Sequence, residues 1–93
     1  MVVVADMWGP AVKGFHYVYI LESESTPGRH YTGLTDDLAA RVKVHNSGGC
    51  PHTSKFRPWH IRVALAFHTR EQAVAFEKYL KSHSGRAFAK NHF

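Results

Sequence analysis

The chain has 93 residues, of which 44% are hydrophobic and 13% aromatic, and its formal net charge is +5. This length accommodates one small domain with a modest core, and the composition excludes a disordered chain. A single cysteine, Cys50, excludes an internal disulfide and fits a reducing compartment. The N-terminal stretch MVVVADMWGP lacks the basic start and long apolar run of a signal peptide or membrane span. We therefore expect a cytoplasmic protein with no membrane association.

Positive charge is concentrated in the C-terminal part. Residues 1–37 carry two Lys/Arg against five Asp/Glu, whereas residues 38–93 carry ten against two. Such a field favours a polyanionic partner, and nucleic acid is the commonest one. An anionic membrane surface, an acidic protein and a generic solvated surface are the alternatives.

The first half of the chain predicts a β-hairpin and a helix. Residues 1–14 show no sustained period and are expected to form a tail or an edge segment, with the folded domain at 15–93. FHYVYILES and RHYTG are β-branched and aromatic runs, and the Pro-Gly of ESTPG between them is typical of a turn. Thr35 is a candidate N-cap for a helix over residues 36–46, which carries Asp36 and Asp37 in its first turn.

The second half begins with a long polar and basic loop, SGGCPHTSKFRPW. HIRVALAFH alternates, which predicts a third strand with one buried face made of Ile61, Val63, Leu65 and Phe67.

Two helices are predicted to close the domain. Thr69 and Gln72 form a capping box for a helix over about residues 70–83. Ser84-Gly85 is expected to end it, and RAFAKNHF to form a short final helix that packs Phe88 inward. The expected fold is α+β, a small three-stranded antiparallel sheet flanked by helices in the order β-β-α-β-α-α.

Two polar side chains of the first predicted helix face the core. Leu38 and Val42 define the inward stripe, and Arg41 and His45 lie on or beside it. Four residues apart, they point in the same direction and can converge on a common ligand or partner.

Glu77 lies near the buried stripe of the second predicted helix, beside Ala73, whereas Lys78 and Lys81 take the outer surface. A carboxylate at that position needs a partner. A salt bridge with an arginine such as Arg41 or Arg62 and coordination of a divalent metal are the two interpretations.

Aromatic and loop residues offer further candidates with plain alternatives. Tyr17 and Tyr19 share one face of the first strand and Tyr31 comes from the next, which ordinary sheet packing also explains. Cys50 and His52 with His45 are conceivable zinc ligands, but the C-x-H spacing fits no recurring four-ligand pattern. The loop also supplies candidate phosphate contacts, with solvated loop polarity as the alternative, in Thr53, Ser54, Lys55 and Arg57.

These segments together resemble the GIY-YIG endonuclease superfamily. YVYIL and YTG are followed by Arg41, by His45-Asn46 and by a distant FEKYLKS helix, and the resemblance runs from about Phe15 to Phe93. It is closest to short stand-alone bacterial members related to the nuclease domain of the repair excinuclease C subunit. Val18, Thr32 and Leu34 depart from the family's usual residues at their positions. The resemblance assigns roles in the motifs and the site to Tyr19, Tyr31, Gly33, Arg41, His45 and Glu77.

The resemblance implies a metal-dependent endonuclease that hydrolyses phosphodiester bonds in DNA, with Mg²⁺ or Mn²⁺ held mainly by Glu77. Arg41 would offer a charged fork to the phosphate. Tyr19, or else Tyr31, would accept the proton of the attacking water if nearby positive charge lowered its pKa, with His45 as an alternative base or an orienting group. A non-catalytic nucleic-acid-binding module and a nuclease subunit activated by a protein partner are the alternatives.

The expected substrate follows from what surrounds this core. No zinc finger or helix-turn-helix is evident, so we expect low sequence specificity. Exposed aromatics such as Tyr17, Phe56 and Trp59 would stack on unpaired bases and favour single-stranded or branched DNA. The expected nucleic-acid contacts are Gly33, Lys43, Thr53, Ser54, Lys55, Arg57, Lys78 and Lys81.

Overall fold

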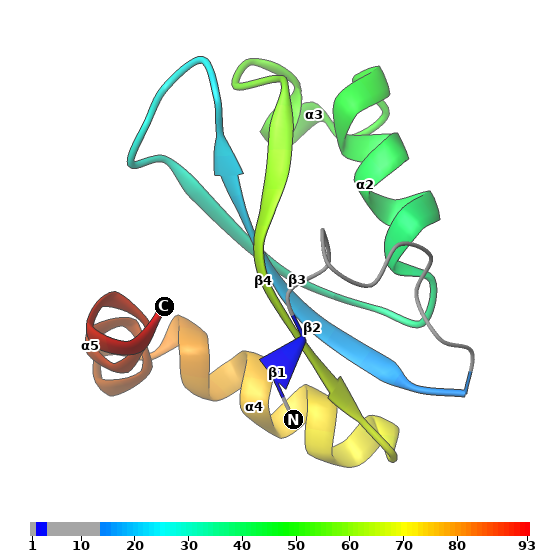
Figure 1. Ribbon diagram of the computed structural model, residues 1–93, viewed down its shortest axis with the longest axis vertical. Coiled ribbons are helices and arrows are strands. Elements are labelled where there is room, and N and C mark those ends of the chain that lie inside the picture. The colour runs from blue at the N-terminus through cyan, green and yellow to red at the C-terminus, as the bar shows by residue number, and fades with distance from the viewer. Residues whose placement is uncertain (1, 4–13) are drawn as a thin grey trace.

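One antiparallel sheet forms the centre of the molecule (Figure 1). The computed structural model describes residues 2–3 and 14–93. Its strands are β1 (Val2–Val3), β2 (His16–Ser23), β3 (His30–Thr35) and β4 (Trp59–Phe67), in the spatial order β1-β4-β2-β3. The predicted three-stranded sheet is confirmed in β2, β3 and β4, and the two-residue β1 pairs with the outer side of β4.

Helices cover both faces of the sheet (Figure 1). On one side lie α2 (Leu38–Ser47) and the single-turn α3 (Pro51–Ser54); on the other lie α4 (Arg70–Lys81) and α5 (His83–His92). The order β-β-α-β-α-α is confirmed for the longer elements, with α3 inserted where a loop was expected. Among residues 2–3 and 14–93, no helix has the length and apolarity needed to cross a membrane.

Alternation along β2 explains the two layers. Tyr17, Tyr19 and Leu21 pack beneath α2, whereas Val18 and Ile20 pack beneath α4 and α5, and all five are buried. Successive side chains of a strand point to opposite faces, so a strand that is apolar at every position needs cover on both sides.

A β-bulge in β4 divides its apolar side chains between the two faces. Ile20 pairs with Val63 but Leu21 pairs with Ile61, which leaves Arg62 as the extra residue. A one-residue shift sends the following side chains to the other face. Ile61 therefore packs on the α2 side, and the prediction that it shares a face with Val63 is wrong.

The start of α2 differs from the prediction by one local hydrogen bond. Asp37, not Thr35, is the N-cap, because its side chain accepts from the Ala40 amide at 3.1 Å. Thr35 Oγ1 instead accepts from the Asp37 amide at 3.0 Å. The helix consequently begins at Leu38, and neither Asp36 nor Asp37 lies in its first turn.

The junction between α4 and α5 also lies earlier than expected. Thr69 caps α4 by accepting from the Gln72 amide at 3.2 Å, as predicted, but α4 ends at Lys81 and Ser82 caps α5. Ser84 and Gly85 belong to α5. A Cβ at Gly85 would collide with the Tyr79 carbonyl, so this glycine permits close approach of the two helices and does not end one.

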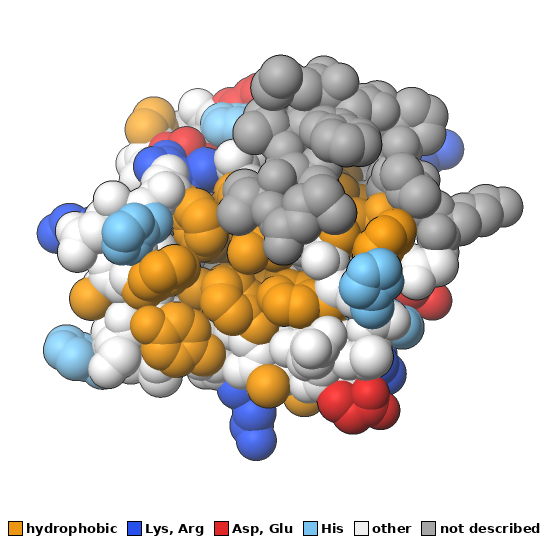
Figure 2. All heavy atoms as spheres, turned by 60° about the horizontal axis from the view of Figure 1, so that its bottom comes forward, with side chains coloured by type: hydrophobic (Ala, Val, Ile, Leu, Met, Phe, Trp, Pro, Cys, Tyr) orange, Lys and Arg blue, Asp and Glu red, His pale blue; other side chains and the backbone are white. Residues whose placement is uncertain are grey.

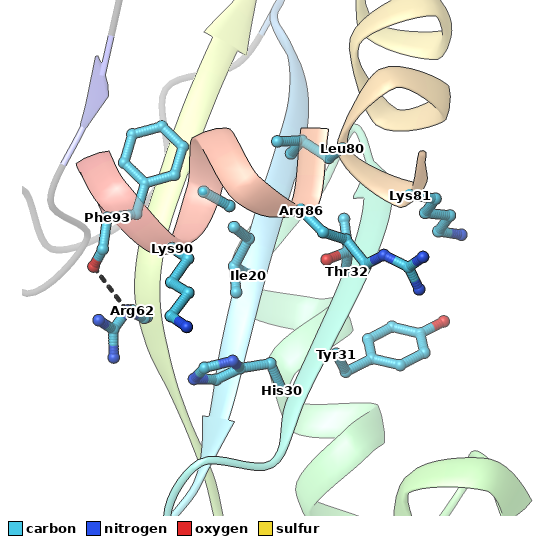
Figure 3. Close-up of a pocket in the computed structure, with 11 residues that line it drawn as sticks. Ile20, His30, Tyr31, Thr32, Arg62, Leu80, Lys81, Arg86, Lys90 and Phe93 are labelled. Atoms are coloured by element: carbon cyan, nitrogen blue, oxygen red, sulfur yellow. Dashed lines mark hydrogen bonds between the residues drawn. The ribbon is translucent and has the colours of Figure 1, made fainter. Parts of the chain in front are cut away.

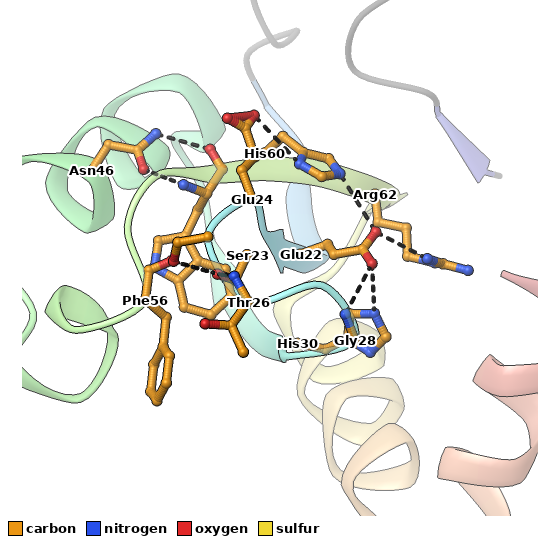
Figure 4. Close-up of polar contacts among 12 residues, drawn as sticks. Glu22, Ser23, Glu24, Thr26, Gly28, His30, Asn46, Phe56, His60 and Arg62 are labelled. Atoms are coloured by element: carbon orange, nitrogen blue, oxygen red, sulfur yellow. Dashed lines mark hydrogen bonds and ion pairs between the residues drawn. The ribbon is translucent and has the colours of Figure 1, made fainter.

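Polar contacts fix α2 and the hairpin at one end of the sheet (Figure 4). The Asn46 amide donates to the Trp59 carbonyl at 3.0 Å and accepts from the Trp59 amide at 2.6 Å. Buried Ser23 donates to the Phe56 carbonyl at 2.6 Å. The Asn46 bonds hold the C-terminal end of α2 against the start of β4, and the Ser23 bond holds the end of β2 against the loop before β4.

An aromatic row joins α4 to α5. Figure 2 shows hydrophobic side chains gathered on one face of the molecule. Phe76 and Tyr79 have ring centroids 6.0 Å apart, and Tyr79 lies 6.0 Å from Phe88. Phe88 packs against the core as predicted, whereas Tyr79 is 40% exposed.

Candidate active site

Tyr19 and Gly33 face each other across β2 and β3, and their contact explains the glycine. They are direct partners in the strand register. A Cβ at Gly33 would collide with the Tyr19 ring and hydroxyl. The glycine therefore lets the phenol lie against β3 and reach toward α2. Since Gly33 is buried under that ring, this steric function replaces the nucleic-acid contact expected from the sequence.

A buried chain of hydrogen bonds starts at the Tyr19 hydroxyl. Tyr19 Oη lies 3.0 Å from His45 Nε2, and His45 Nδ1 lies 2.8 Å from Thr53 Oγ1. Thr53 Oγ1 donates to the Cys50 carbonyl at 3.3 Å, so it accepts from His45 Nδ1–H. His45 Nε2 is then the unprotonated nitrogen that accepts from Tyr19. The chain points from the phenol through the imidazole to the backbone of α3.

Thr53 is a residue whose role the sequence did not reveal. It was expected to contact phosphate, but it is 1% exposed and its hydroxyl is fully engaged. The single turn of α3 places it there, because the Thr53 and Ser54 amides both bond to the Cys50 carbonyl. Pro51 at the first position of α3 was the signal for this turn.

We expect Thr53→Val to destabilise the protein by about 1–3 kcal/mol, because it leaves the His45 Nδ1–H buried without an acceptor. Thr53→Ser keeps the hydroxyl and should retain most of that stability. Urea unfolding of both variants measures the difference. Equal stability of the valine and serine variants would show that the hydrogen bond is unimportant.

Arg41 and Tyr31 surround the same phenol. The Arg41 guanidinium lies close enough to the Tyr19 hydroxyl to lower the pKa of the phenol. The Tyr31 ring lies 4.8 Å from the His45 ring and 6.3 Å from the Tyr19 ring, measured between centroids. The structure thus brings together four of the predicted site residues, namely Tyr19, Tyr31, Arg41 and His45.

Burial dominates the proton affinity of Tyr19. It raises the pKa of the phenol to about 12, against the lowering effect of Arg41. The positive charge of Arg41 lowers this pKa, as expected, but desolvation raises it by more. Tyr19 is therefore protonated at neutral pH and must release its proton to act as a base.

His45 has the opposite shift. Burial, and secondly the charge of Arg41, lower the pKa of the imidazole below its ordinary value of 6.5. The neutral imidazole therefore persists at neutral pH with Nε2 as an acceptor.

This shift predicts a loss of stability in acid. The folded pKa of His45 lies below the unfolded value, so its contribution is complete above about pH 6.5 and falls as the pH drops toward the folded pKa. The slope reaches at most about 1.4 kcal/mol per pH unit. Unfolding free energies of the wild type and His45→Gln between pH 7.5 and 5.5 isolate the effect. Identical pH slopes of the two proteins would contradict it.

Glu77 lies on α4, across the sheet from α2. Its Oε2 atom is 3.3 Å from Lys81 Nζ, whereas Arg62 bonds Glu22 at 3.1 Å. The predicted alternatives of a salt bridge to Arg41 or Arg62 are therefore wrong, because Lys81 is the partner one turn away. Within residues 2–3 and 14–93, no hydrogen bond or ion pair joins Glu77 to the site around Tyr19.

The side chains near the candidate site decide which kind of metal ion they could hold. In the described part of the chain, no group of three or more His, Cys, Asp or Glu side chains is arranged to hold a metal. Both nitrogens of His45 are engaged in hydrogen bonds, which conflicts with the zinc alternative with Cys50 and His52. A single carboxylate with a side chain 20% exposed suits Mg²⁺ or Mn²⁺, which retain waters and take further oxygens from a substrate phosphate.

The remaining predicted nucleic-acid contacts are mostly exposed. Lys43 on α2, Lys55 and Arg57 after α3, and Lys78 and Lys81 on α4 all reach solvent. Ser54 is half-buried, and its hydroxyl donates to the Pro51 carbonyl at 3.2 Å.

Two of the three aromatics expected to stack on bases are buried, and the third is half-buried. Tyr17 and Trp59 are buried in the core, and the Trp59 indole donates to the Thr53 carbonyl at 2.9 Å. Phe56 is half-buried, and the Arg29 guanidinium lies 4.3 Å above its ring. That prediction is wrong because strand and loop aromatics complete the core beneath α2 and α3.

Comparison with known proteins decides the family. Residues 15–91 match the profile of the GIY-YIG catalytic domain. The chain belongs to the GIY-YIG family. Among its relatives, the UPF0213 protein BH0048 of Halalkalibacterium halodurans is 40% identical over 72 residues, which cover 76% of this chain and 74% of the relative. The UPF0213 protein YazA of Bacillus subtilis is 36% identical over 71% of this chain and 66% of its own length.

A eukaryotic relative is much longer than this GIY-YIG chain. The structure-specific endonuclease subunit SLX1 of Scheffersomyces stipitis is 37% identical over 73 residues. These cover 71% of this chain but 22% of the relative. The likeness is therefore confined to the GIY-YIG domain.

Proposed function

We propose that this GIY-YIG domain is a divalent-metal-dependent endonuclease that hydrolyses phosphodiester bonds in DNA, with low sequence specificity and a preference for single-stranded or branched DNA. The observation that carries the proposal is the buried chain from Tyr19 through His45 to Thr53, with Arg41 on the same phenol. A directed proton acceptor beside a permanent cation is what attack of water on a phosphodiester needs.

Arg41 binds the scissile phosphate in this proposal. Its guanidinium offers several donors in a rigid fork that matches phosphate oxygens, and it remains charged at every relevant pH. The half-buried position on the inner face of α2 strengthens its interaction with the charge that develops on the phosphate.

Tyr19 and His45 move the proton. The Tyr19 oxygen accepts a proton from the attacking water as its own proton passes to His45 Nε2. The phenol is neutral before and after this transfer, so its high pKa does not prevent it. His45 Nδ1–H stays bonded to Thr53, which keeps Nε2 directed at the phenol.

Glu77 is the proposed ligand of Mg²⁺ or Mn²⁺, together with waters and substrate oxygens. An ion held by Glu77 would supply polarisation of the phosphate and stabilisation of the leaving oxygen. Lys81 must release the carboxylate when the ion binds, because it occupies Glu77 Oε2.

The preference for branched DNA draws on the relatives. The SLX1 proteins of Scheffersomyces stipitis and Giardia intestinalis are named structure-specific endonuclease subunits. Because these relatives are named subunits, a second candidate is a nuclease that a protein partner activates. The pairing of Glu77 with Lys81 also supports this candidate. The proposed compartment is the cytoplasm.

The test is cleavage by the purified chain. One labelled oligonucleotide is offered alone, annealed to its complement and built into a flap, in Mn²⁺, Mg²⁺ or EDTA. We expect metal-dependent cutting that is slowest on the perfect duplex. Binding of all three substrates without cutting in any metal would contradict an endonuclease that acts alone. It would favour the non-catalytic binding module or the nuclease subunit that needs a partner.

A further inference from the structure

A cavity of about 700 Å³ lies between the sheet and α5, on the face opposite α2 (Figure 3). Figure 3 shows Ile20 near its middle, Tyr31 at one end and Arg62 toward the other. This volume falls within the usual range of about 300–1,000 Å³ for small-molecule sites.

The cavity combines an apolar surface with positive charge, and no Asp or Glu among residues 2–3 and 14–93 lines it. Its apolar side chains are Ile20, Leu80, Ala89 and Phe93. Its cations are Arg62, Lys81, Arg86 and Lys90. A flat apolar group that carries an anion fits such a lining, and a nucleotide has both parts.

Two of these cations are available for an anion. Arg62 bonds Glu22, and Lys81 bonds Glu77. In the part of the chain that the structure describes, no carboxylate lies within ion-pair distance of Arg86 or Lys90. Because these two residues are four apart on α5, they present their charges on one side of the helix.

Tyr31 connects the cavity to the candidate active site. Its ring lies 4.8 Å from His45 and packs on the α2 side of the sheet, yet it also lines the cavity at the edge strand β3. A DNA strand bound at Arg41 can therefore continue around β3 into the cavity.

We propose that this cavity holds one unpaired nucleotide beside the scissile phosphate, with its base against Ile20 and Ala89 and its phosphate on Arg86 and Lys90. The inference rests on the proposed function and specifies its substrate. A base that is stacked in a duplex cannot enter a cavity covered by α5, so the nucleotide must be unpaired or extruded. Binding of the base in this cavity takes the place of stacking on exposed aromatics, because Tyr17 and Trp59 are buried.

The test measures binding in EDTA, so that catalytic failure does not affect it. The probe is a fluorescent DNA hairpin with a single-nucleotide bulge, compared with the same hairpin whose bulged nucleotide is abasic. We expect the wild type to bind the base-containing bulge about tenfold more tightly, since contact with one base is worth roughly that factor. Equal affinity for the two hairpins would overturn the proposal.

Variants locate the effect. Ala89→Leu, or Ala89→Met if the leucine variant fails to fold, fills the cavity and should abolish the difference between the hairpins. Arg86→Ala should weaken both hairpins and reduce the salt dependence of log Kd by about one unit, whereas the exposed Arg70→Ala should do neither. Retained discrimination in a folded Ala89 variant would place the base elsewhere. A chain that shows this pattern but never cuts DNA would contradict only the endonuclease.

Discussion

Glu77→Gln is expected to lower the single-turnover cleavage rate by about 10³-fold in Mg²⁺ or Mn²⁺, since the stabilisation that a bound ion gives the transition state amounts to several kcal/mol. The amide keeps the size of the side chain but is a much poorer ligand for a hard cation. Only a partly exposed ion pair with Lys81 is lost, so unfolding free energy should change by less than about 0.5 kcal/mol.

The matched control is Glu71→Gln, an exposed carboxylate on the same helix, which should cut at the wild-type rate. DNA affinity in EDTA should be equal or slightly higher for Glu77→Gln, because one negative charge is removed. Cleavage by this variant at the wild-type rate in Mn²⁺ would remove Glu77 from the metal site.

Arg41→Lys is expected to lower the cleavage rate by about 10³-fold or more, by analogy with arginines that stabilise transferring phosphoryl groups. Lysine is a point charge and cannot reproduce a bidentate fork on the phosphate. Arg41→Ala should lose at least as much.

Single-turnover rates at saturating enzyme separate this loss from weaker binding. The control Lys43→Ala, on the exposed side of α2, should alter affinity and its salt dependence more than the rate. If Arg41→Lys cut DNA as fast as the wild type, any cation would suffice at this position.

The centre of the fold and of the site could be predicted because local patterns specify them. The dense apolar runs of β2 and β4 require a sheet, and the helical spacing of Leu38, Arg41 and His45 requires that the last two face it. Turn and cap residues such as Thr69 were equally informative, since a single side-chain oxygen decides where α4 begins.

The predictions from the sequence were wrong where a tertiary contact overrides a local signal. Nothing near Arg62 in the sequence announces a bulge, so Ile61 was assigned to the wrong face. Glycine is common at helix ends, so Gly85 was expected to end a helix. In the structure it permits close packing against Tyr79. Thr53 was predicted to contact phosphate because its partner His45 is eight positions away and α3 alone brings them together.

The central claim is that the Tyr19 hydroxyl takes part in phosphodiester hydrolysis. The most direct measurement is the single-turnover cleavage rate of a flap substrate by Tyr19→Phe in Mn²⁺. Phenylalanine keeps the ring over Gly33 and removes only the oxygen that bonds His45 and lies beside Arg41. The account predicts a rate about 10²–10⁴-fold lower at unchanged DNA affinity, with Tyr79→Phe, an exposed tyrosine on α4, at the wild-type rate. Cleavage by Tyr19→Phe at the wild-type rate would contradict the account.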